Sequence, residues 1–181
     1  MKVNYKAWMI LGVLALALAM APASQAQLNS NQATVALNAT LAESLTVAAG
    51  PATVNFTLLA AGISNGSAPV AVTTTWVLAP TRTSVKLYAY FSSVNALTDG
   101  SGNNIPTANV SGSVNAGPFG AFTGGAGPFG TENIQVFNQA IGAANWSSSR
   151  NDSVALRINT TGLGLPSGTY TGTLNVQAQA L

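Results

Sequence analysis

The sequence contains no histidine and no cysteine, and its only charged residues are six basic and four acidic ones. Without imidazole and thiol groups, the chain cannot build a Ser-His-Asp or Cys-His nucleophile system, a thiolate or imidazole metal site, or a disulfide. Its few carboxylates lie in separate segments, so they show no signature of the acid pair that glycoside hydrolysis needs. We therefore expect a non-catalytic protein with no cofactor and no metal site.

The start of the chain has the pattern of a secretory signal. Lys2 and Lys6 precede an apolar run over residues 8–21. That run suits the core of a signal peptide, and it is shorter than the roughly 20 residues that span a bilayer. We therefore expect export to a periplasm, the cell surface or the medium, with no membrane span in the mature chain.

Small residues at positions 24 and 26 predict cleavage after Ala26, with cleavage after Ala23 as the alternative. We interpret residues 1–26 as the signal peptide and residues 27–181 as one domain. Two of the six basic residues lie in the signal, so the exported part keeps four basic and four acidic residues. A neutral, charge-poor chain cannot neutralise a phosphate backbone, and we expect no nucleic-acid partner.

Apolar residues recur with a period of two through most of the exported part. The clearest alternating stretches are residues 70–78, 85–91, 154–159 and 170–180. Further strands are expected near residues 33–41, 44–48, 52–59 and 133–137. Successive side chains of a strand point to opposite faces, so this alternation predicts half-buried strands. We predict an all-β fold, namely a single immunoglobulin-like or pilin-like Greek-key β-sandwich of about eight or nine strands.

Residues 112–131 differ from the rest because seven of these twenty residues are glycine. Glycine gives the backbone high conformational freedom, so we expect a long loop here. Its phenylalanines, Phe119, Phe122 and Phe129, either fold back to cap one end of the core or form a contact surface. Aromatic residues on loops are common anchors for protein partners and sugars.

Residues 33–41 place Val35, Leu37, Ala39 and Leu41 on one face of an expected strand. Such a strand can complete its own domain or add to the edge of a neighbour's sheet, where backbone hydrogen bonds and alternate side chains fix it. Natural edge strands usually carry charges or proline that prevent pairing, and this chain has few charges to use in that way. Near-zero net charge also removes repulsion between copies. The sequence allows both outcomes.

The two ends of the exported part resemble a known group of secreted proteins. Residues 165–174, Leu-Pro-Ser-Gly-Thr-Tyr-Thr-Gly-Thr-Leu, lead into an alternating C-terminal stretch. This pattern is similar to the last strand of spore-coat-U-like and chaperone–usher pilin-like proteins, and the segment from Val35 to Leu41 is similar to their first segment after the signal. The resemblance implies an incomplete immunoglobulin-like sandwich, completed by a strand from a chaperone and then from a neighbouring subunit in a surface fibre.

Together these patterns indicate a secreted, non-catalytic structural subunit of a cell-surface or extracellular assembly. It would associate by strand pairing, with itself or with a surface-assembly partner. The alternative is a monomeric adhesin or carbohydrate-binding module that uses the loop phenylalanines.

A deletion tests the first hypothesis. We expect the mature protein to form oligomers and a variant lacking residues 27–41 to be monomeric, because the deletion removes the strand that would pair. Size-exclusion chromatography with light scattering measures both. An intact mature chain that stays monomeric at high concentration would contradict the hypothesis.

Overall fold

The computed structural model describes residues 28–124 and 128–181, so the predicted signal peptide lies outside the described part. In these ranges the regular elements are β-strands and one 3₁₀ turn, Thr107–Asn109, and every strand pair is antiparallel. The all-β prediction is therefore confirmed. No helix among these residues has the length and hydropathy needed to cross a membrane.

The chain divides into two units. The first ends at Ala39, and its described part, residues 28–39, forms no strand or helix. The second, from Thr40 to Leu181, holds all the strands. The expected strand at residues 33–41 is therefore not formed, because no segment within residues 28–124 and 128–181 pairs with it.

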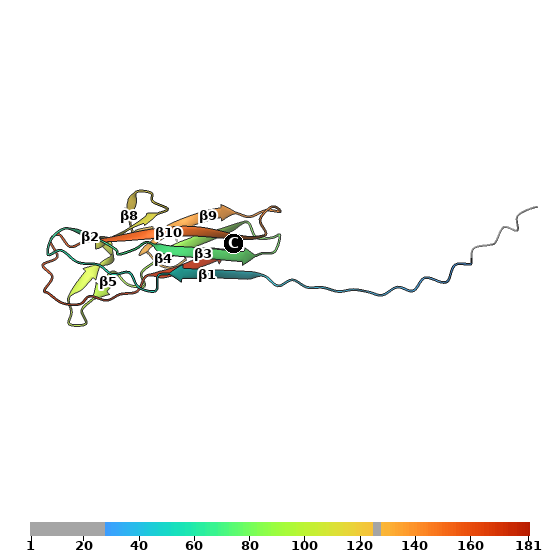
Figure 1. Cartoon of the computed structure of the whole chain (residues 1–181), viewed down its shortest axis with the longest axis horizontal. Coiled ribbons are helices and arrows are strands. Elements are labelled where there is room, and N and C mark those ends of the chain that lie inside the picture. Colours follow the sequence, from blue (N-terminus) through green and yellow to red (C-terminus); the bar gives the residue numbers. More distant parts are fainter. Residues whose placement is uncertain (1–27, 125–127) are drawn as a thin grey trace, which may run out of the picture. The chain divides into compact units, whose positions relative to one another are not determined.

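The larger sheet has six strands and is built around one long central strand (Figure 1). Its order is β1-β3-β10-β7-β8, and β2 pairs with the far part of β10. The bounds are β1 Ser44–Gly50, β2 Ile63–Asn65, β3 Val70–Val77, β7 Val110–Val114, β8 Phe119–Ala121 and β10 Ser147–Asn159.

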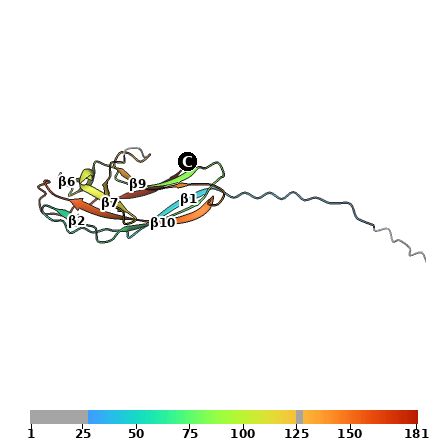
Figure 2. The same ribbon diagram turned by 90° about the horizontal axis from the view of Figure 1, so that it is seen from above.

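The smaller sheet has three strands in the order β11-β4-β9, and Figure 2 shows the two sheets in separate layers. Its strands are β4 Ser84–Tyr90, β9 Asn133–Ala140 and β11 Asn175–Ala180. A bulge between Leu87 and Tyr88 interrupts the pairing of β4 with β9. A separate hairpin consists of β5 (Asn95–Thr98) and β6 (Asn104–Pro106).

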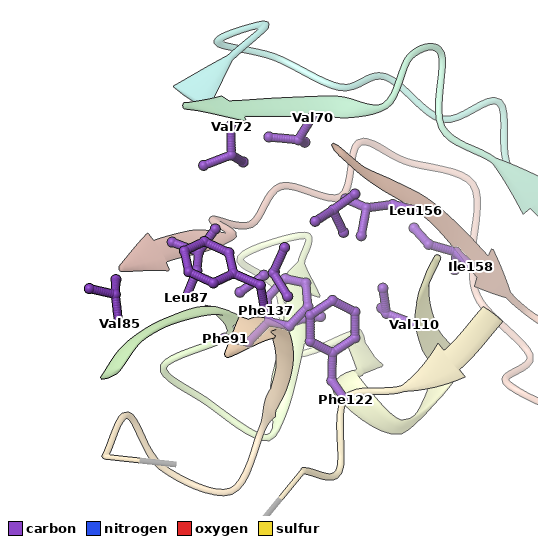
Figure 3. Close-up of a cluster of buried hydrophobic side chains, with 14 of the residues drawn as sticks. Val70, Val72, Val85, Leu87, Phe91, Val110, Phe122, Phe137, Leu156 and Ile158 are labelled. Carbon is purple, nitrogen blue, oxygen red and sulfur yellow. The ribbon is translucent and has the colours of Figure 1, made fainter. Parts of the chain in front are cut away.

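Both sheets contribute to one hydrophobic core (Figure 3). Alternate residues of β3, β4 and β10 point inward, and the buried ones are Val70, Val72, Trp76, Val85, Leu87, Ala89, Val154, Leu156 and Ile158. Burying each large aliphatic side chain contributes roughly 1.5–3 kcal/mol. The strands predicted over residues 70–78, 85–91, 133–137 and 154–159 are present, and in β3 and β10 burial alternates from residue to residue as the sequence pattern requires.

Two other alternating stretches form less strand than expected. Residues 52–59 make only an isolated bridge, Phe56 with Gly66, and residues 170–174 make only the bridge between Thr171 and Thr98. Alternation requires one buried face, but a regular strand also requires a backbone partner along its length. Residues 52–59 and 170–174 each turn one face toward the core, but neither stretch has a backbone partner along its whole length.

Candidate functional site

An uncharged groove, lined by both apolar and polar groups, lies between these two incompletely paired stretches. One lip is formed by residues 52–60, which follow β1, and the other by residues 165–176, which lead into β11. Between them are two adjoining cavities of about 420 and about 730 Å³, which share Val54, Phe56 and Ile158 among their lining residues. We call this feature the rim groove.

The first lip is extended and alternates in burial. Val54, Phe56 and Leu58 are half-buried against the core, whereas the residues between them are exposed. Backbone bonds hold this lip on one side, where the Ser67 N–H donates to the Asn55 carbonyl at 2.8 Å. Gly66 permits this approach, because a Cβ there would lie 2.7 Å from a methyl carbon of Val54.

The second lip is also held on one side only. Thr171 exchanges two backbone hydrogen bonds with Thr98, each of 2.9 Å. Gly172 passes so close to β5 that an added Cβ would collide with the Ala96 carbonyl oxygen. The apolar residues of this lip are half-buried, and they are Leu165, Tyr170, Leu174 and Val176.

The strands that continue the two lips have unused edges. In the described part of the chain, β1 pairs only with β3 and β11 pairs only with β4. The two strands lie next to each other, at the same margin of the two sheets. Their inward side chains, such as Val47 and Ala178, are only half-buried. An unpaired edge beside an uncharged hollow is a template for another extended chain.

The groove offers binding chemistry and no obvious acid–base chemistry. None of the residues lining the two cavities is charged. Its one tyrosine, Tyr170, donates from its hydroxyl to the Pro166 carbonyl at 3.0 Å. Burial, with a smaller effect from the charge of Asp99, raises the pKa of Tyr170 above its usual value of 10.0. Over residues 28–124 and 128–181, no group of three or more Asp or Glu side chains could hold a metal ion.

The apolar side chains of residues 33–41, the predicted assembly strand, are exposed to solvent. Val35, Leu37 and Leu41 are 83%, 90% and 83% exposed, and Ala39 is exposed as well. Large apolar side chains at this exposure are unfavourable in water, and three of them together with Ala39, spaced with a period of two, suit an extended partner site.

The three loop phenylalanines do not share one surface. Phe122 is fully buried and meets Phe91 edge-on, with 4.9 Å between ring centroids. Phe119 in β8 lies under the Arg157 guanidinium at 4.2 Å. Phe129 stacks on Tyr90 at 5.2 Å, above the smaller sheet. Phe122 is thus a core residue, and β8 lies inside the segment expected to be a loop.

An ion pair fixes the start of β1, and no sequence pattern predicted it. The Glu43 carboxylate accepts hydrogen bonds from the Ala79 N–H at 2.7 Å and from Arg82 Nε and Nη2 at 3.1 Å each. The Arg82 hydrogen bond, followed by that of Ala79, lowers the pKa of Glu43 below 4.5. The same contact raises the pKa of Arg82.

Residue substitutions test the environments of the phenylalanines. We expect Phe122→Ala to lower the free energy of unfolding by about 3–5 kcal/mol, because it leaves a cavity in the core. Phe129→Ala should cost only about 1 kcal/mol, because its ring is only half-buried and packs on Tyr88 and Tyr90 at the edge of the core. Urea unfolding followed by tryptophan fluorescence measures both, and equal losses would contradict this assignment.

Acid should loosen the start of β1. The pKa of Glu43 is lower in the folded than in the unfolded protein. Ionised Glu43 therefore stabilises the folded state above pH 4.5, and this stabilisation is lost as the pH falls through the pKa of the folded state. We expect amide protection in β1, corrected for intrinsic exchange, to decrease over that acidic range. Glu43→Gln should remove this pH dependence, and an unchanged profile in the variant would exclude Glu43 as its cause.

Comparisons with known proteins identify no relative. No protein-family model matches the chain, and no curated protein or solved structure matches it significantly. Function must therefore be argued from the rim groove, the unused strand edges and the exposed segment.

Proposed function

We propose that the protein is an exported structural subunit of a cell-surface or extracellular assembly. In this proposal residues 33–41 of one copy form a strand in the rim groove of another, and the fold is an immunoglobulin-like or pilin-like Greek-key sandwich left open along one margin. The observation that carries the proposal is that one chain contains both an uncharged groove, whose lips present half-buried apolar side chains, and an exposed segment with an apolar residue at every second position.

The chemistry of the two parts is complementary. Insertion would bury Val35, Leu37 and Leu41, each worth roughly 1.5–3 kcal/mol before the cost of association. It would also cover the half-buried apolar side chains of both lips. Backbone groups of the segment would pair with the free edge of β11 or β1, as in strand addition to a sheet edge.

The local sequence favours a neighbour's groove over the segment's own. Only Ala42 and Glu43 separate Leu41 from the start of β1 at Ser44. A return into the same groove needs a tight reversal, and residues 39–44 contain no glycine, proline, asparagine or aspartate. The hydrogen bonds of Glu43 to Ala79 and Arg82 further restrict such a turn.

The direction of insertion determines the kind of assembly. We call the end of the body that holds the β3–β4 turn the entry end. Strand β1 starts at the entry end, and strand β11 runs toward it. A segment antiparallel to β11 would leave the groove at the opposite end, the far end, and copies would join head to tail. We favour this direction because antiparallel strand pairs are slightly more stable than parallel ones. A head-to-tail contact joins two different surfaces, so it is heterologous and builds open chains of subunits.

The alternative function, a monomeric carbohydrate-binding or adhesive module, has weaker support. It requires aromatic side chains that gather on one accessible surface. Phe122 lies in the core, and Phe119 and Phe129 pack on different sheets. We therefore favour the structural subunit.

A matched pair of substitutions tests the proposal. Leu37→Asp places a charge on the face that would enter the groove and should weaken self-association by at least about 100-fold, as judged from the lost burial and the cost of desolvating the charge. Asn38→Asp adds the same charge to the opposite face and should have little effect. Sedimentation equilibrium of the mature proteins measures the difference, and equal association of the two variants would contradict the proposal.

Mixing gives a second readout. The Leu37→Asp protein keeps an intact groove, so it can accept a segment but cannot donate one. Substoichiometric amounts should therefore shorten assemblies of the unchanged protein. Assemblies of unchanged length would argue against insertion of this segment.

A further inference from the structure

Beyond Leu41, the described body of the protein, residues 42–124 and 128–181, carries five exposed large apolar side chains. They are Leu59 (53% exposed), Ile63 (49%), Val94 (64%), Trp146 (37%) and Leu181 (44%). Ile63 lies on the exposed face of the short strand β2, and the other four lie outside the strands. Strand register places them in two groups, one at each end of the body.

Three of them lie at the far end. Ile63 pairs with Asn159, the last residue of β10. The Leu59 carbonyl accepts a hydrogen bond from the Thr160 hydroxyl at 2.7 Å. The Val94 carbonyl accepts one from the Thr107 N–H at 2.8 Å, just before β7 begins beside the end of β10. We call Leu59, Ile63 and Val94 the far-end group.

The other two lie at the entry end. The Trp146 carbonyl accepts a hydrogen bond from the Leu78 N–H at 2.8 Å, where β3 ends and β10 begins. Leu181 donates its N–H to the Ser84 carbonyl at 2.9 Å, at the start of β4. The Trp76 indole N–H anchors the loop before Trp146 by donating to the Asn145 carbonyl at 2.9 Å. We call Trp146 and Leu181 the entry-end group.

The linker between the segment and the body is too short to keep two bodies apart. From Leu41 to Ser44 there are only two intervening residues. Even fully extended, three residue steps span no more than about 11 Å. If Leu41 leaves the groove at the far end of one copy, the entry end of the next copy must begin within that distance.

From this constraint we propose that the far-end group of one copy packs against the entry-end group of the next. The contact rests on the proposed function. Its partner is a second copy of this chain. Leu59 of the far-end group also lines the rim groove, whereas Ile63 and Val94 lie outside its lining, so substitutions at these two residues test the contact separately from strand insertion. Because the two surfaces differ, the contact is heterologous, and it would fix the angle between successive bodies instead of leaving them on flexible joints.

The described chain has no free cysteine, and the sequence has none at all, so introduced pairs report contacts cleanly. We expect full mature chains with Val94→Cys and Ala144→Cys to form a disulfide ladder of dimers, trimers and longer species on mild oxidation. Ala144 is exposed beside Trp146 at the entry end. A control pair, Val94→Cys with Thr75→Cys on the outer face of β3, should give no ladder. Adding Leu37→Asp should abolish the ladder at the same concentration.

Each outcome is decisive. Oligomers seen by light scattering without the Val94–Ala144 cross-link would overturn the end-to-end contact and leave the proposed function in place. Cross-linked dimers of the Ala144→Cys single variant would show that entry ends meet each other, which contradicts the head-to-tail arrangement. Absence of oligomers would overturn both proposals.

A kinetic measurement is independent of the disulfides. Changing Ile63 and Val94 together to Ser leaves the lining of the groove intact and should speed dissociation of the oligomers by about tenfold, because interface changes act mostly on dissociation rates. Ala48→Ser with Ala71→Ser, on the outer face of the larger sheet, is the matched control. Equal dissociation rates for the two variants would overturn the contact.

Discussion

The need of every extended segment for a backbone partner is the constraint on which this structure depends. Strands β1 and β11 each have a hydrogen-bonded partner strand on one side only. The stretches that continue them, residues 52–59 and 170–174, are held by isolated bridges. The outer edge of β9 is also unpaired in the described chain, but a bulge in its pairing with β4 distorts that strand. The margin beside the groove has no such distortion in its pairings, and an uncharged hollow adjoins it.

The few charged residues serve the fold and leave the groove neutral. Glu43 and Arg82 fix the start of β1. Arg150 pairs with Asp152 at 2.8 Å, and the Asn115 amide donates to the same carboxylate at 2.7 Å. Arg157 rests on Phe119. With the charges used in this way, association at the groove would depend on apolar burial and backbone pairing, which salt screens little.

The sequence predicted those parts of the fold that local periodicity determines. Alternation identified β3, β4 and β10, because a half-buried strand shows its burial at every second residue of the sequence. It could not identify the groove, since residues 52–60 and 165–176 are brought together by the fold and their alternation says nothing about backbone partners. Nor could it separate Phe122 from Phe129. Gly112 makes room for Phe122, where a Cβ would lie 3.3 Å from the ring.

The presence of both the segment and the groove in one polypeptide has a consequence for growth. An assembly formed by the proposed insertion would have two chemically unlike termini, one with an empty groove and one with an unused segment. Nothing within the subunit would limit its length, so a cell would have to set that length from outside. A peptide that fills the groove and a protein that sequesters the segment would block opposite termini.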